Sequence, residues 1–138
     1  MTIALVARRT IKASVSRVFD AWTSPEQLRA WWGPRPVTCS DAEVDLRVGG
    51  KLRIVNALPD GSTVTIDGEF RVVEPPHRLV YTWQMGGESS LVTVTFAARG
   101  EATEVVVVHE QIPSEAVRES HESGWAGCLD GLERNFLP

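Results

Sequence analysis

Six segments in the middle of the chain alternate apolar and polar residues with a period of two, and only short turn sequences separate them. A period of two is typical of strands that bury one face, and short connections require neighbouring strands to run antiparallel. The turn signals are Gly49-Gly50, Pro59-Asp60-Gly61, Pro75-Pro76, Gly86-Gly87 and Arg99-Gly100-Glu101. This pattern therefore predicts an antiparallel meander between about residues 37 and 110.

The C-terminal segment has a helical period instead. Ser114 can cap the N-terminus of a helix there, and Glu115 complements the helix dipole. Apolar or ring side chains recur every three or four residues, at Val117, His121, Trp125, Cys128, Leu132 and Phe136. The spacing predicts one long amphipathic helix with a single buried face.

The N-terminal segment predicts a strand followed by two short helices. Residues 3–12 suit a strand at a sheet edge, and Ser14 and Ser24 are placed to cap the helices, with Gly33-Pro34 ending the second. The chain has 138 residues, the length of one domain. We predict a single α+β domain over residues 1–138, in which a curved antiparallel sheet of about seven strands wraps around the C-terminal helix.

Composition excludes several classes of protein. A net charge of −4 argues against binding to nucleic acid or to anionic membranes. No apolar run is long enough to span a membrane, and no basic leader precedes an apolar stretch at the start, so we expect a cytoplasmic protein. Cys39 and Cys128 are expected to be free, buried thiols.

The sequence contains none of the metal-binding, phosphate-binding or nucleophile motifs that have a known mechanism, so we expect no metal and no cofactor. Asp41, Glu43 and Asp45 alternate along one strand and are expected to form an exposed charged face. His77 follows two prolines and is expected to lie in a solvated turn.

Aromatic residues predict either a ligand pocket or a well-filled core. Five tryptophans accompany a single tyrosine, and strand parity places Leu79, Tyr81 and Trp83 on one face. Val92, Val94 and Phe96 likewise share a face, as do Val105, Val107 and His109. Rings with a few polar tips are typical of small-molecule pockets, but they also occur in closely packed cores, and composition leaves both open.

Three glycines lie inside the predicted last helix, at positions 124, 127 and 131. Each costs about 1 kcal/mol relative to alanine, so something must compensate. One explanation is close approach of the helix to another element, and the other is space kept for a ligand beside Trp125. Both can hold at different heights along the helix.

Several motifs, taken together, resemble the bacterial homologues of the activator of the heat-shock-protein-90 ATPase, a family within the START-like (SRPBCC) superfamily. The resemblance covers nearly the whole chain and rests on Trp31-Trp32-Gly33-Pro34, Asp45-Leu46-Arg47-Val48-Gly49-Gly50, Glu74-Pro75-Pro76-His77-Arg78-Leu79, Tyr81-Thr82-Trp83, His109-Glu110, Gly124-Trp125 and Cys128-Leu129-Asp130-Gly131-Leu132. It implies the helix-grip fold of the birch-pollen allergen, with a deep cavity between sheet and last helix. It also implies that His109 points inward, and that Gly131, where the family usually has a longer polar residue, widens the pocket.

These observations favour a protein that binds a small hydrophobic or aromatic ligand in an internal cavity. The residues expected to line it are Trp31, Phe70, Tyr81, Trp83, Val94, Val107, His109, His121, Gly124, Trp125 and Cys128. A second hypothesis is an enzyme of the cyclase, hydrolase or isomerase type, with His109 and His121 as general acid or base and Tyr81 as a polar helper. A third is an interaction module, such as a chaperone partner, anchored on whichever of Trp31 and Trp32 is exposed. The edge of the first strand leaves both a monomer and a homodimer open.

A short link joins the last strand to the last helix, so His109 and His121 are expected at the same end of the cavity. Burial disfavours a charged imidazole, and the pKa of each ring is therefore expected below 6.5 unless a carboxylate reaches it. Neutral rings could orient a carbonyl or hydroxyl group of a ligand.

Overall fold

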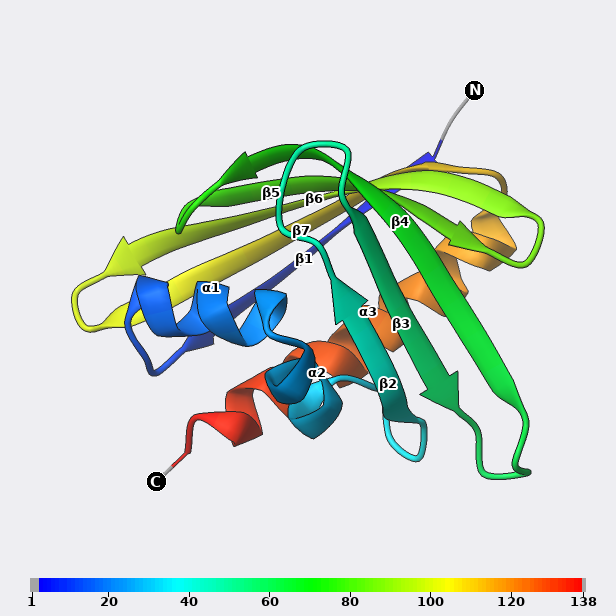
Figure 1. The fold of residues 1–138 in the computed structure, drawn as a ribbon, viewed down its shortest axis with the longest axis horizontal. Helices are drawn as coiled ribbons and strands as arrows, with labels where there is room; N and C mark the ends of the chain where they lie inside the picture. The colour runs from blue at the N-terminus through cyan, green and yellow to red at the C-terminus, as the bar shows by residue number, and fades with distance from the viewer. Residues whose placement is uncertain (1–2, 138) are drawn as a thin grey trace.

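A seven-stranded antiparallel sheet arches over one long helix in the computed structural model, which describes residues 3–137 (Figure 1). The strands lie in the order β1-β7-β6-β5-β4-β3-β2. The elements are β1 (Ile3–Ile11), α1 (Val15–Thr23), α2 (Pro25–Trp31), β2 (Thr38–Val44), β3 (Lys51–Ala57), β4 (Thr63–Glu74), β5 (Arg78–Met85), β6 (Glu88–Arg99), β7 (Ala102–Ile112) and α3 (Glu115–Asn135). The predicted meander and the helix-grip architecture are confirmed, and β1 completes the sheet by pairing with β7.

The polar caps define where the helices begin. The side chain of Ser14 accepts a hydrogen bond from the backbone of Arg17, and that of Ser24 accepts one from Gln27. Ser114 does the same for α3. All three caps were predicted, because a short polar side chain before an apolar period is a helix start signal.

Strand parity is also as predicted, and it defines the inner face of the sheet. Residues of the expected inward sets are at most 5% exposed, namely Leu79, Tyr81, Trp83, Val92, Val94, Phe96, Val105, Val107 and His109. The inward position of His109 that the family resemblance implied is therefore confirmed.

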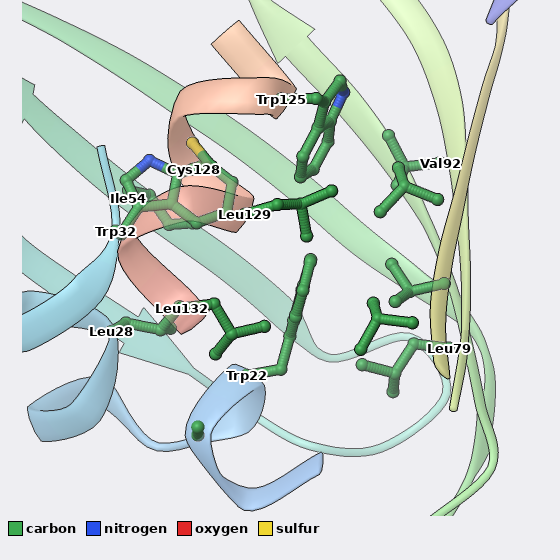
Figure 2. Close-up of a cluster of buried hydrophobic side chains, with 14 of the residues drawn as sticks. Trp22, Leu28, Trp32, Ile54, Leu79, Val92, Trp125, Cys128, Leu129 and Leu132 are labelled. Atoms are coloured by element: carbon green, nitrogen blue, oxygen red, sulfur yellow. The ribbon is translucent and has the colours of Figure 1, made fainter. Parts of the chain in front are cut away.

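Trp22 of α1 fills the middle of the space between α3 and the sheet. Figure 2 shows its indole standing between Leu132 and Leu129 of α3 on one side and Leu79 on the other. The ring stacks on Trp125, with 6.1 Å between centroids and 19° between planes. This part of the interior is a closely packed core, so any cavity must lie elsewhere.

The expectations for the charged strand residues, for His77 and for the cysteines are confirmed as well. Asp41, Glu43 and Asp45 are exposed, and so is His77. Both cysteines are free and buried. Within residues 3–137, no helix has the length and apolar character needed to cross a membrane.

Candidate functional site

A cavity of about 290 Å³ lies between the N-terminal half of α3 and strands β3 to β5. The segment between α2 and β2 closes one side of it. Its walls are mainly apolar and include three indole rings. The lining residues are Trp32, Pro34, Val37, Asn56, Leu58, Val64, Ile66, Trp83, Met85, Ser120, His121, Gly124, Trp125 and Cys128.

The three glycines of α3 have two different roles. A Cβ atom at Gly127 would lie 2.5 Å from Cβ of Pro34, and one at Gly131 would overlap the carbonyl oxygen of Trp31. These two positions let α2 and the segment after it approach the helix. A Cβ at Gly124 would meet no atom within 4 Å, and this residue lines the cavity. Close approach to another element therefore accounts for Gly127 and Gly131, whereas Gly124 lies beside open space, at a different height along the helix.

The expectation that Gly131 widens the pocket is wrong. Its missing side chain is needed for contact with the backbone of α2, and the residue is not part of the cavity wall. A comparison of residue sizes at this position does not show that the backbone of α3 lies against the carbonyl of Trp31 here.

One wall of the cavity is fixed by a pair of hydrogen bonds. The indole Nε1–H of Trp32 donates to Oδ1 of Asn56 at 3.0 Å, and Nδ2 of Asn56 donates to the carbonyl of Val64 at 3.2 Å. Asn56 is 7% exposed and its amide is used on both sides. The carbonyl oxygen and one of the two N–H groups of the amide therefore have partners, and these two bonds fix the orientation of the Asn56 side chain in this wall.

His121, a polar residue of the cavity wall, pairs with the largely buried carboxylate of Glu88. Nε2 of His121 lies 2.8 Å and 2.9 Å from the two carboxylate oxygens of Glu88. The side chains of the pair are 7% and 9% exposed. Ser90, two residues along β6, lies 2.8 Å from Oε2 of the same carboxylate. Since a carboxylate only accepts, Nε2 of His121 and the hydroxyl of Ser90 both donate to Glu88.

Behind this pair, His109 is held in one tautomer. The Nε1–H of Trp125 points at Nδ1 of His109 at 3.1 Å. An indole N–H only donates, so Nδ1 accepts and a neutral His109 has its proton on Nε2. Nε2 lies 2.7 Å from the hydroxyl oxygen of Ser90, to which it donates. The hydrogen bonds thus run in one direction, from Trp125 through His109 and Ser90 to Glu88.

Burial keeps His109 neutral. The side chain has no exposed surface, and this burial, together with the electrostatic influence of the adjacent His121 imidazole, lowers the pKa of His109 to about 3. The two imidazoles are stacked, with centroids 4.5 Å apart. The predicted fall in pKa is confirmed for His109.

The structure brings together five of the residues expected to line a cavity and separates six. Trp83, His121, Gly124, Trp125 and Cys128 line it. The expectation fails for Trp31, Phe70, Tyr81, Val94, Val107 and His109, which are buried in the packed interior outside the cavity wall. The physical reason is that other side chains fill the space. Trp22 enters the central interior from α1 and packs against Trp31 and Trp125, while His109 lies behind His121 and Trp125.

Two further expectations about aromatic side chains are wrong. Trp31 and Trp32 are 3% and 5% exposed, so neither offers the exposed anchor that the interaction hypothesis required. Trp31 donates its indole N–H to the carbonyl of Ala21, which ties α2 to α1. Tyr81 is buried away from the cavity, where burial raises the pKa of its hydroxyl, so it is not placed to help the histidines.

Sequence reasoning missed Glu88, Ser90 and Asn56, although strand parity could have found them. Glu88 and Ser90 have the parity of Val92, which the sequence placed inside. Asn56 likewise shares the parity of Ile54 in β3. A polar residue at an inward position is the useful signal, because a buried polar group needs a partner there.

Cys128 on the cavity wall is expected to be unreactive in the folded protein. Burial raises the pKa of its thiol to about 12, and only the thiolate is nucleophilic. In a Cys39→Ser variant, where Cys128 is the sole thiol, labelling by a disulfide reagent at pH 8 should be at least about 100-fold slower in the folded state than in denaturant. Equal rates in the two states would contradict this burial.

A curved antiparallel sheet gripping a C-terminal helix, with a cavity between the two, defines the class of helix-grip proteins. Within that class, the chain belongs to the family described as Activator of Hsp90 ATPase homolog 1-like protein, whose model matches residues 12–136. The resemblance read from the sequence is thus confirmed.

Solved structures agree with this assignment. A protein from Chromobacterium violaceum is 25% identical, with a TM-score of 0.89 over 98% of this chain and 97% of its own. An uncharacterised protein from Rhizobium leguminosarum is 30% identical, with a TM-score of 0.78 over 96% and 93% of the two chains. One from Nitrosomonas europaea is 25% identical, with a TM-score of 0.83 over 96% and 92%. No curated protein sequence matches the chain.

Proposed function

We propose that this protein binds a small, largely apolar molecule in the cavity beside Gly124. The observation that supports this most strongly is the open space over that glycine. A helix-internal glycine costs about 1 kcal/mol relative to alanine. At Gly127 and Gly131, close packing against α2 and the segment after it offsets this cost. At Gly124 the described residues provide no such packing, and the missing side chain instead leaves part of the cavity open.

The dimensions and walls of the cavity favour a ligand of one or two rings. Its volume of about 290 Å³ lies at the lower end of the range for ligand pockets, roughly 300–1,000 Å³. The rings of Trp32, Trp83 and Trp125 line it, and indole faces pack well against other aromatic rings. A flat aromatic molecule therefore matches both the size and the surface of the site.

We expect 1-methoxynaphthalene, a neutral two-ring probe, to bind with 1:1 stoichiometry in a calorimetric titration. Because the ligand binds only the folded state, it should raise the free energy of unfolding by about 2.7 kcal/mol at a concentration one hundred times Kd. A Gly124→Leu variant should bind at least about tenfold more weakly, since the new side chain occupies the cavity.

The matched control is Ala126→Leu, which adds the same side chain to an exposed position two residues along α3. It should leave the affinity unchanged. Equal affinity of the protein and of Gly124→Leu for the probe would place binding elsewhere, and failure of the unaltered protein to bind any one- or two-ring probe would refute the proposal.

A further inference from the structure

His121 has one ring nitrogen to offer a molecule in the cavity. Its Nε2 is used by Glu88, and in the described part of the chain no protein group forms a hydrogen bond with its Nδ1. The residue itself is part of the cavity wall. Nδ1 is therefore the polar atom of this ring that remains for a ligand, beside walls that are otherwise mainly apolar.

The hydrogen-bond network fixes what Nδ1 can do. Glu88 only accepts, and its other partner, Ser90, uses its single proton on the same carboxylate because its oxygen receives the proton of His109. Nε2 of His121 must therefore hold a proton. If His121 is neutral, Nδ1 has a lone pair that accepts an O–H group, and if it is charged, Nδ1–H donates to an oxyanion. In both cases, a ligand oxygen bound at Nδ1 would share one proton with that nitrogen.

We propose that the ligand of this cavity carries an acidic O–H group, as a phenol or carboxylic acid does, which pairs with Nδ1 of His121. This inference rests on the proposed function and names the class of ligand for the same cavity. The Glu88–His121 pair is suited to such a group because Glu88 accepts the Nε2–H of His121, which leaves Nδ1 without a partner among the described residues and able to share a proton with an oxygen atom. The aromatic body of the ligand would lie toward Trp83 and Trp125, the rings beside His121.

A metal ion is the alternative ligand for the side chains of Glu88, His109 and His121. Ligand atoms of Glu88, His109 and His121 lie within 4.8 Å of one another, and two histidines with a carboxylate form a common metal-binding set. Coordination through Nε2 of His109 would, however, place the ring proton on Nδ1, where it would face the N–H of Trp125. Two donors would then oppose each other, so the observed contacts favour the proton network.

The test compares 1-naphthol with 1-methoxynaphthalene, which has the same rings but no acidic proton. We expect the unaltered protein to bind the naphthol about tenfold more tightly. This preference should disappear in His121→Phe, which keeps a ring and removes Nδ1, while affinity for the ether is retained. Glu88→Gln, which keeps an acceptor for Nε2 but removes the charge, should reduce the preference and serves as a second variant should His121→Phe fold poorly.

Ser120→Ala is the matched control, since it removes a different polar group of the cavity wall and should leave the preference unchanged. Equal affinities for naphthol and ether in the unaltered protein, or a preference that survives both His121→Phe and Glu88→Gln, would overturn the inference and leave the proposed function intact. Absence of binding of both probes would refute the proposed function itself. Stoichiometric uptake of Zn²⁺ that is lost in His109→Gln would overturn the tautomer assignment and with it the inference.

Discussion

Replacing Gly131 with alanine should lower the free energy of unfolding by about 3 kcal/mol, the upper part of the range for overpacking a core. The new Cβ would overlap the carbonyl oxygen of Trp31, a backbone atom at the end of α2 that cannot move without displacing that helix. Gly127→Ala should act in the same direction, because its Cβ would lie 2.7 Å from Cα of Pro34. Urea unfolding monitored by tryptophan fluorescence measures both.

The same replacement at Gly124 should have the opposite sign. No atom lies within 4 Å of the position of its Cβ, so alanine adds helix propensity without a clash and should raise the free energy of unfolding by about 0.5–1 kcal/mol. The three variants differ only in what the added methyl group meets. Loss of stability in Gly124→Ala comparable to that in Gly131→Ala would show that the helix is closely packed along its whole length, and that the cavity is filled.

Stability should also fall steeply in acid because of His109. Its pKa is about 3 in the folded protein and near 6.5 in an unfolded chain. Between these values the unfolded state binds a proton that the folded state does not, so the free energy of unfolding decreases as the pH falls from about 6.5 toward 3. The slope from this group alone approaches about 1.4 kcal/mol per pH unit.

A His109→Gln variant should show a flatter dependence over that interval, since glutamine can accept from Trp125 and donate to Ser90 without titrating. His77→Gln is the control, because His77 is exposed and its removal should leave the slope unchanged. Urea unfolding at a series of pH values measures the free energy of unfolding of each variant and its pH dependence. The same slope in His109→Gln and in the unaltered protein would mean that other groups cause the acid sensitivity.

Local patterns were sufficient for the elements and for their inner faces. The period of two and the turn residues predicted the meander, the serine caps predicted the helix starts, and parity grouped the residues of each strand that share a face. The inward position of His109 came from the family resemblance. The strand period, the turn residues, the helix caps and the strand parity each depend on a few neighbouring residues, so they can be recognised in the sequence alone. Glu88 and Ser90 share the parity of Val92, but a polar side chain at such a position can equally lie at an exposed strand end, so parity alone did not identify them as buried.

The position of the cavity within the fold was decided by contacts between residues far apart in the chain. Trp22 and Leu79 are separated by more than fifty positions, yet the indole of Trp22 packs beside Leu79 in the centre of the interior, where the sequence had left a ligand cavity open. The position of the Trp22 ring depends on how α1 packs against α2 and α3. The interior space that this ring fills is therefore defined only when all three helices have packed together.

The sequence by itself determined the fold class and the buried face of the last helix, which includes His121, because alternation and helical spacing record which side of an element is buried. The family resemblance added the inward position of His109. The tertiary structure alone decided which glycine is open and which two are closely packed, and which carboxylate meets His121. Those outcomes depend on what faces each residue from another element. A glycine has the same sequence signature whether its missing side chain makes room for Pro34, for the backbone of Trp31 or for a ligand.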